Sequence, residues 1–202
     1  MGHITKTLAA LAATATLLAG ASAGAQAQSF MPTTGLSSQP IGHFEFCQRK
    51  PQECAPTNAA GAQFELTREL WAKIVEVNNL VNTMVAPRTD WELWGVEEFW
   101  AYPENGYGDC EAYALEKRRL LIQAGVPAAS LLMTVVRQQN GEGHAVLTVN
   151  TSMGDFILDN LEPRVLRWHE TDYEILKRVS ERHAGQWIGV SDHRNVVVGS
   201  VR

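Results

Sequence analysis

The sequence predicts a single α+β domain, and the order of its periodic segments is the reason. Two stretches with apolar residues at helical spacing, residues 66–86 and 110–125, come first. Three short apolar or alternating stretches that favour strands come later, at residues 131–137, 144–150 and 155–159. Helices followed by clustered strands are typical of an α+β fold, with helices against one face of an antiparallel sheet.

The first 27 residues predict a secretory signal peptide, which leaves residues 28–202 as one mature domain. Lys6 is the only formally charged residue of this stretch, an alanine- and leucine-rich segment follows it, and residues 25–27 read Ala-Gln-Ala, an A-x-A cleavage pattern. No later apolar run approaches the roughly 20 residues that span a bilayer. We expect an exported protein that is not membrane-embedded, and periplasmic if the source is Gram-negative.

Composition argues against one class of partner. The chain of 202 residues is 45% hydrophobic, which suits one domain with a core, and its formal net charge at pH 7 is −5. An acidic protein has no general electrostatic attraction for nucleic acids or anionic membranes. We therefore expect no nucleic-acid partner. We also expect no organic cofactor.

The three cysteines divide into a pair and a single thiol. In an oxidising compartment we expect Cys47 and Cys54 to form a disulfide across a short loop, in residues 43–56. A zinc site with His43 is the alternative, although the gap between the two cysteines is longer than zinc sites usually have. Cys110 is left unpaired, and an odd cysteine in an exported protein indicates a free thiol.

The remaining elements are predicted in chain order. Residues 28–41 are rich in Ser, Thr, Pro and Gly and are expected to be extended or poorly ordered. Thr67 is the expected N-cap of the first helix, which Pro87 ends. Residues 88–108 are predicted as a loop whose aromatic side chains either wall a cleft or cover the core. They include Trp91, Trp94, Phe99 and Trp100. Residues 171–182 are predicted as a helix, and residues 187–201 as one or two last strands.

Cys110 is expected at the first position of a helix. Asp109 before it is a good N-cap residue, and Gly125 is typical of the position just past a helix end. The positive end of the helix dipole favours a thiolate and lowers the pKa of a cysteine placed there. Cys110 is therefore a candidate nucleophile. The alternative is an inert buried cysteine.

The predicted hairpin brings a histidine and a carboxylate together. If the turn at residues 151–154 is symmetric, Asn150 pairs with Asp155 and Asp159 lies opposite Val146. Asp159 is then a diagonal neighbour of His144 on the same face, within reach of its side chain. A carboxylate that orients an imidazole, which in turn faces a cysteine, is the arrangement of covalent hydrolases and acyl transferases. Each residue alone also has an ordinary structural interpretation.

These residues lie in motifs that resemble a known family, the bacterial transglutaminase-like cysteine proteinases. The resemblance covers residues 46–168. It is carried by Phe46-Cys47 with Pro51 and Cys54, VNNLVN at residues 77–82, GDCE at 108–111, LLMTVVR at 131–137, GEGHAVLTV at 141–149 and GDFILDNL at 154–161. It implies a papain/transglutaminase-like fold with the catalytic helix packed against an antiparallel sheet, and a Cys–His–Asp triad at Cys110, His144 and Asp159.

The resemblance also implies a metal and partners. Its LapG-type periplasmic branch releases large surface adhesins, needs calcium, and is controlled by an inner-membrane receptor. The acids of its calcium site match Asp109 and Glu111. Two carboxylates beside Cys110 oppose thiolate formation, and a bound Ca²⁺ would cancel that penalty. The family commonly has a third acid where this chain has Ala112, and Asp109 and Glu111 are also ordinary first-turn helix acids. Calcium ligation and helix capping both remain open.

We therefore expect an exported cysteine endopeptidase that works through a thioacyl-enzyme on a protein substrate. Cys110 is the nucleophile, His144 the base and Asp159 its orienting partner. The Cys110 backbone N–H and the Trp100 side chain are the expected oxyanion donors. Amine transfer by a transglutaminase starts from the same acyl-enzyme and is one alternative. A non-catalytic periplasmic binding module is the other. His43, His169, His183 and His193 are assigned to surface or structure.

Overall fold

The structure, a computed structural model, describes residue 2 and residues 29–57 and 64–194. Its main feature is a seven-stranded sheet in which every neighbouring pair is antiparallel. The order across the sheet is β1-β9-β8-β4-β5-β6-β7. The strands are β1 (Thr33–Ser37), β4 (Leu131–Arg137), β5 (Gly143–Thr151), β6 (Gly154–Leu158), β7 (Leu166–Arg167), β8 (Glu174–Ser180) and β9 (His183–Val190).

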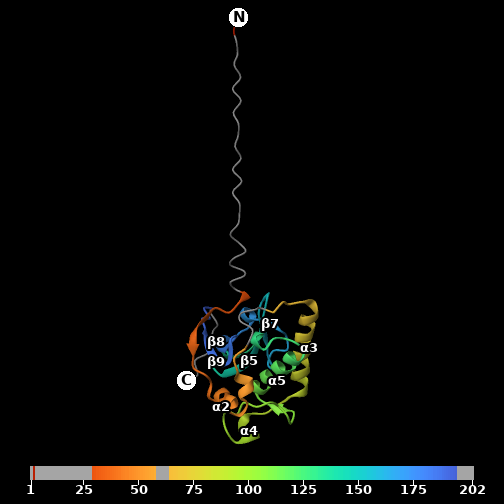
Figure 1. Ribbon diagram of the computed structural model, residues 1–202, viewed down its shortest axis with the longest axis vertical. Helices are drawn as coiled ribbons and strands as arrows, with labels where there is room; N and C mark the ends of the chain where they lie inside the picture. The colour runs from red at the N-terminus through yellow and green to blue at the C-terminus, as the bar shows by residue number, and fades with distance from the viewer. Residues whose placement is uncertain (1, 3–28, 58–63, 195–202) are drawn as a thin grey trace.

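Helices lie beside this sheet. They are α2 (Ile41–Arg49), α3 (Arg68–Met84), α4 (Asp90–Trp94) and α5 (Cys110–Gln123), with 3₁₀ turns η1 (Pro51–Cys54), η2 (Ala128–Ser130) and η3 (Trp168–Glu170). Strands β2 (Ala86–Pro87) and β3 (Tyr107–Gly108) form a small parallel pair. Figure 1 shows α3 and α5 side by side, with α4 at the end of the molecule farthest from β7. The mixed architecture confirms the predicted α+β class.

The two long helices begin and end near the predicted residues. The Thr67 side chain caps α3 by accepting a hydrogen bond of 3.1 Å from the Leu70 N–H. Cys110 is the first residue of α5, and Gly125 follows its end with a φ of 91°, the left-handed conformation that glycine adopts without strain.

The core has one cluster on each face of the sheet. Leu147 and Leu158 belong to the larger cluster, together with Ile74 of α3 and Leu121 of α5. Val146 and Ile157 belong to the second cluster, with Met31 and Trp168. Alternate residues of β5 therefore face opposite sides, as strand geometry requires. The helix α5 covers β5 and β4 on the larger-cluster side.

The β5–β6 hairpin has the predicted register. Asn150 pairs with Asp155, and Thr151 with Gly154 across the turn. Gly154 has a φ of 122°, and a Cβ there would lie 2.4 Å from the Ser29 carbonyl oxygen. The turn therefore needs glycine at this position for both conformation and space.

Several predicted elements were wrong. Residues 174–180, within the helix predicted at residues 171–182, form strand β8. This strand pairs with β4 and β9 and places Ile175 in one core cluster and Val179 in the other. The disulfide loop contains α2 and η1, whereas the N-terminal stretch, predicted as extended or poorly ordered, contains the extended strand β1. The loop at residues 88–108 contains α4, and the last strand begins at His183. The predicted signal peptide lies outside the described residues except for Gly2, and so does the end of the chain from residue 195.

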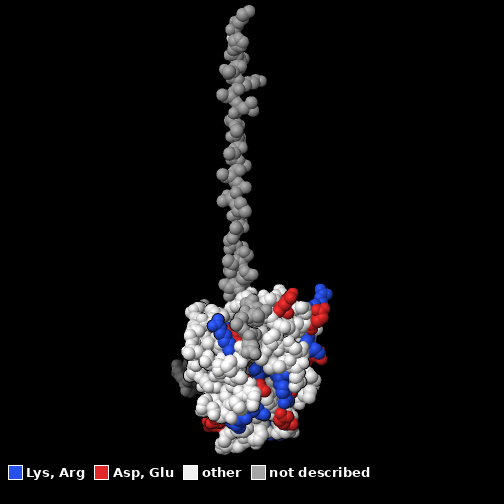
Figure 2. Space-filling model, in the orientation of Figure 1, with Lys and Arg blue, Asp and Glu red and all other residues white. Residues whose placement is uncertain are grey.

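The surface carries mixed charge. On the face in Figure 2, acidic and basic side chains lie in small mixed groups. In the described part of the chain, no helix is long and apolar enough to cross a membrane.

Candidate active site

His144 and Asp159 form a buried pair. Nε2 of His144 lies 2.8 Å from Oδ1 of Asp159, and the two residues are 6% and 2% exposed. The pairing follows from the hairpin, because His144 stands near the start of β5 and Asp159 directly follows β6. The structure thus brings together two of the three predicted triad residues.

The electrostatics of this pair favour an ionised carboxylate. Burial alone raises the pKa of Asp159, but the hydrogen bond and charge of His144 and the hydrogen bond from Tyr173 outweigh it. The pKa of Asp159 therefore lies below its ordinary value. Because Asp159 occupies Nε2 of His144, the proton on that nitrogen is directed to the carboxylate, and Nδ1 is the nitrogen left to take a proton from a reactant.

Three further groups hold Asp159. The Leu161 N–H donates to Oδ1 over 3.0 Å, and the Tyr173 hydroxyl donates to Oδ2 over 2.5 Å. The Asn82 side-chain amide, from α3, donates to the Asp159 main-chain oxygen over 2.8 Å. Tyr173 was not predicted as a site residue, because residues 171–182 were predicted as a helix.

Cys110 reaches β5 at the residue after His144. The β5–β6 ladder begins at Leu147, and before that point the Ala145 N–H faces the Cys110 sulfur. The thiol itself donates to Oε2 of Glu111, 3.0 Å away. Among the described residues, no hydrogen bond links Cys110 to His144. Cys110 therefore lies next to the strand position that carries His144, but its thiol points toward the Glu111 carboxylate.

The expected low pKa of Cys110 is not found. Burial raises the pKa of the thiol, and the nearby carboxylates of Glu111 and Asp109 raise it further. A helix N-terminus carries the equivalent of only about half a positive charge. Two acidic neighbours in a site this buried outweigh it.

Three acids gather at the start of α5. Asp109 and Glu111 flank Cys110, and Asp90 from α4 lies against Asp109. Burial, and secondarily the carboxylate of Glu111, raise the pKa of Asp109 to about 7. Burial also raises the pKa of Asp90 to about 6. Asp109 occupies the N-cap position, where the Ala112 N–H of the first turn lowers the pKa of its carboxyl, but this contact does not offset the effect of burial.

This cluster has the donor chemistry of a site for a hard cation. Carboxylate oxygens are the ligands that Ca²⁺ prefers, and closely spaced acids with raised pKa values lose their mutual repulsion when a cation binds. Ala112, at the position of the family's third acid, is buried and 6% exposed. Asp90, which lies against Asp109, is a third carboxylate close to this position. Sequence reasoning missed Asp90, although Thr89 and Glu92 form a capping box around it that marks a helix start.

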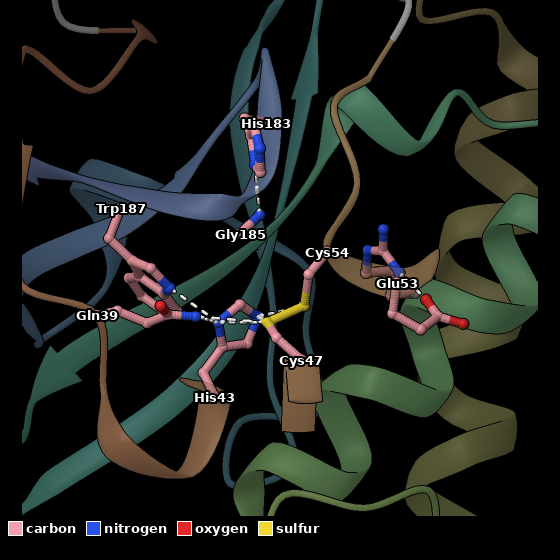
Figure 3. The surroundings of a disulfide bond; sticks show 9 residues. Gln39, His43, Cys47, Glu53, Cys54, His183, Gly185 and Trp187 are labelled. Atoms are coloured by element: carbon pink, nitrogen blue, oxygen red, sulfur yellow. Dashed lines mark hydrogen bonds and ion pairs between the residues drawn. A yellow bond between two sulfur atoms is a disulfide. The ribbon is translucent and has the colours of Figure 1, made fainter. Parts of the chain in front are cut away.

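The Cys47–Cys54 disulfide is present, with an S–S distance of 2.02 Å. Figure 3 shows the His43 ring beside the two sulfur atoms, with Gln39 and Trp187 on its other side. Nδ1 of His43 lies 2.8 Å from Nε2 of Gln39 and accepts from Trp187 over 3.1 Å. Burial, and secondarily the charge of Arg118, lower the pKa of His43 to about 4.

These contacts disfavour the zinc alternative. Nδ1 of His43 is occupied by donors, so the neutral ring carries its proton on Nε2, the nitrogen that faces the sulfurs. Zinc would need a free nitrogen and two thiolates at this place. His43 was expected to be a surface or structural residue, and it is buried beside the disulfide.

The aromatic loop has two parts. Trp100 is 2% exposed and packs edge-on against His43, with ring centres 5.1 Å apart, so it covers the core. Its indole N–H donates to Glu98 over 3.2 Å, which removes it as an oxyanion donor. Trp91 and Trp94 are exposed beside the acids.

A cavity of about 430 Å³ lies on another side of the site, where Asp159, Tyr173 and residues 138–140 line it.

A helix-start thiol beside a histidine–carboxylate hairpin defines the transglutaminase-like class of cysteine enzymes. Residues 33–195 match the family described as bacterial transglutaminase-like cysteine proteinases, and the chain belongs to this family of cysteine peptidases.

Solved structures of LapG from Legionella pneumophila are similar. One is 26% identical, covers 59% of this chain and 68% of that chain, and has a TM-score of 0.50. The calcium-bound form is 26% identical, covers 55% and 65%, and has a TM-score of 0.49. The EGTA-treated form is 24% identical, covers 62% and 69%, and has a TM-score of 0.51. The matched region thus spans about two thirds of the Legionella protein's length. Among curated proteins, none gives a significant match.

Proposed function

We propose that this protein is an exported cysteine endopeptidase with Cys110, His144 and Asp159 as its catalytic triad. One observation supports the proposal. His144 makes a 2.8 Å hydrogen bond to Asp159, and the N–H of Ala145, the residue that follows His144 on β5, faces the Cys110 sulfur. A base with a buried orienting carboxylate is thereby placed next to the chain's single free thiol among the described residues.

The proposed reaction has two stages. Nδ1 of His144 takes the proton of the Cys110 thiol, and the sulfur bonds to the carbonyl carbon of the peptide. The Cys110 N–H, at the start of α5, stabilises the resulting oxyanion. The C–N bond breaks as His144 returns the proton to the leaving amine. Water, deprotonated by His144, then attacks the thioester and releases the acid and the thiol. Asp159 holds the imidazole in one tautomer throughout.

We further propose that Asp90, Asp109 and Glu111 bind calcium. The support is a series of three carboxylates at the start of α5. Asp90 lies against Asp109 and Asp109 against Glu111, the last two adjoin the Cys110 thiol, and all three have raised pKa values. A bound divalent cation would supply positive charge beside Cys110 and favour its thiolate. Glu111 would then bind the ion instead of accepting the hydrogen bond from the Cys110 thiol.

The family resemblance supports the rest of the proposal. We propose a periplasmic location, a large surface adhesin as protein substrate and an inner-membrane receptor as regulatory partner. The Cys47–Cys54 disulfide agrees with an oxidising compartment.

Thiol chemistry and proteolysis test the function together. The mature protein is treated with iodoacetamide near neutral pH with and without calcium, and the modified residue is identified by mass spectrometry. In parallel, cell-surface proteins are incubated with the protein, and new N-termini are mapped. We expect labelling at Cys110 and new termini that a Cys110→Ala variant does not produce. New termini that persist with Cys110→Ala would exclude the mechanism, and a labelled protein that yields none would exclude the peptidase.

A further inference from the structure

Tyr173 holds the side of Asp159 that His144 does not. The Tyr173 hydroxyl donates to Oδ2 over 2.5 Å, whereas His144 and the Leu161 N–H both use Oδ1. Its ring centre lies 5.6 Å from the centre of the His144 ring. The two oxygens of the carboxylate are thus fixed from opposite directions.

We propose that Tyr173 is a positioning residue that sets the angle of the Asp159 carboxylate and, through it, the orientation of the His144 imidazole. The proposal rests on the proposed function for its catalytic meaning. Its geometric part concerns only Tyr173, Asp159 and His144.

The need for a second hold follows from the shape of the carboxylate. With donors on Oδ1 alone, the group can rotate about its Cβ–Cγ bond, since that torsion is broad for aspartate. A donor on Oδ2 removes this freedom. The main chain is already fixed by the Asn82 amide, 2.8 Å from the Asp159 carbonyl oxygen. Tyr173 therefore completes the support at the one place where the side chain could still turn.

The segment that carries Tyr173 is itself anchored. The Arg194 guanidinium donates to the main-chain oxygens of Thr171, over 2.9 Å, and Tyr173, over 2.6 Å. Asp192, bound to Arg194, accepts from the Ile175 N–H over 2.9 Å. This half-buried ion pair, whose hydrogen bonds to the main chain are satisfied, resists displacement. The tyrosine is thus presented to Asp159 from a fixed base.

Two substitutions separate positioning from a general structural role. Tyr173→Phe keeps the ring and removes the hydroxyl. Tyr113→Phe is the matched control, because the Tyr113 hydroxyl also makes one 2.5 Å bond, to the carbonyl oxygen of Val85, the residue that follows α3. Both variants lose one tyrosine hydrogen bond, and a thermal unfolding curve shows whether each remains folded.

The readout is the proton NMR signal of the His144 ring N–H, assigned by its absence in His144→Gln. A ring proton held against a carboxylate exchanges slowly with water. We expect a sharp signal in the wild-type protein and in Tyr113→Phe, and a signal broadened or lost in Tyr173→Phe. We also expect iodoacetamide to label Cys110 about tenfold more slowly in Tyr173→Phe, as for the loss of one charge-assisted hydrogen bond.

The outcomes distinguish the two proposals. An unchanged His144 signal in Tyr173→Phe, or the same loss in Tyr113→Phe, would overturn the positioning role whatever the labelling rate. A signal lost only in Tyr173→Phe supports that role. If labelling is then unchanged, the positioning stands and the proposed activation of Cys110 by His144 fails.

Discussion

The Cys110 thiol donates a hydrogen bond to Glu111, 3.0 Å away, while the imidazole of His144 is hydrogen-bonded to Asp159 within the β5–β6 hairpin. Cys110 and its proposed base, His144, are close in the fold, but each is hydrogen-bonded to a different carboxylate. Glu111 thus opposes the thiolate that catalysis needs, and its neutralisation is the most direct test of how the site is activated.

Glu111→Gln should increase the reactivity of Cys110 in calcium-free buffer. The neutral amide no longer raises the pKa of the thiol by its charge, and one pKa unit corresponds to about a tenfold change in thiolate. We expect iodoacetamide labelling near neutral pH to rise about tenfold, and its response to calcium to be lost. Glu104→Gln, at an exposed acid, is the control. Slower labelling of Glu111→Gln would contradict this account.

Calcium should stabilise the protein more as pH rises. The pKa values of Asp90 and Asp109 are raised to about 6 and about 7 in the folded protein, so between about pH 4 and pH 7 the folded state holds protons that the unfolded state has lost. Stability of the metal-free protein therefore falls across this range through these groups. Calcium displaces the protons, so the difference in Tm with and without calcium should grow toward pH 7.

The calcium experiment compares desalted protein with protein in excess calcium at each pH, so groups away from the site cancel. Asp90→Asn should reduce the calcium-induced rise in Tm. A rise that is independent of pH, or equally large in Asp90→Asn, would remove this cluster from the account.

Lys117→Met should stabilise the protein, most of all at and below neutral pH. Lys117 is fully buried on α5, and burial lowers its pKa to about 7 even though the charge of Asp159 acts in the opposite direction. Between about pH 7 and pH 10.5 the unfolded state binds the proton that the folded state has lost, so stability rises with pH. The penalty is full below this range. The Tm gain of Lys117→Met should therefore shrink above neutral pH.

Lys73→Met, at an exposed lysine paired with Glu76, is the control and should show a small difference that does not vary over this range. A gain for Lys117→Met that grows with pH would have the wrong sign.

Removal of the disulfide should affect stability and not the thiol. The double variant Cys47→Ala/Cys54→Ala should lose about 2–3 kcal/mol of unfolding free energy, because the short loop regains its freedom in the unfolded chain. Denaturant titration measures this loss. Labelling of Cys110 should keep its wild-type rate. A rate that changes as much as it does in Glu111→Gln would mean that the disulfide acts on the site.

Local patterns in the sequence predicted the parts of the fold that depend on local structure. The register of the β5–β6 hairpin was correct because a short turn and strand alternation determine it, and this register placed Asp159 beside His144. Residues 171–182 were misassigned because Tyr173, Ile175, Leu176 and Val179 fit a helix as well as a strand. Pairing with β4 and β9, which no local pattern contains, decided the outcome.

The same limit explains the missing site residues. Asp90 and Tyr173 approach the site from segments far from it in sequence, through α4 and the start of β8. A lowered pKa of Cys110 was predicted from its helix position, and the sequence also showed the two acids that oppose it. Burial, the largest cause of the raised pKa, was not predicted. Helix position is a local property, whereas desolvation depends on everything packed around the thiol.

The closeness in sequence of His144 and Asp159 has a consequence for how the protein folds. Both belong to one hairpin, and local contacts of this kind form early because they close a short loop. Cys110 joins them only when α5 docks on β5, a contact between distant segments. A chain folding from the unfolded state would therefore complete its histidine–carboxylate pair first and bring Cys110 to it last, so that the proposed site assembles only in a nearly finished molecule.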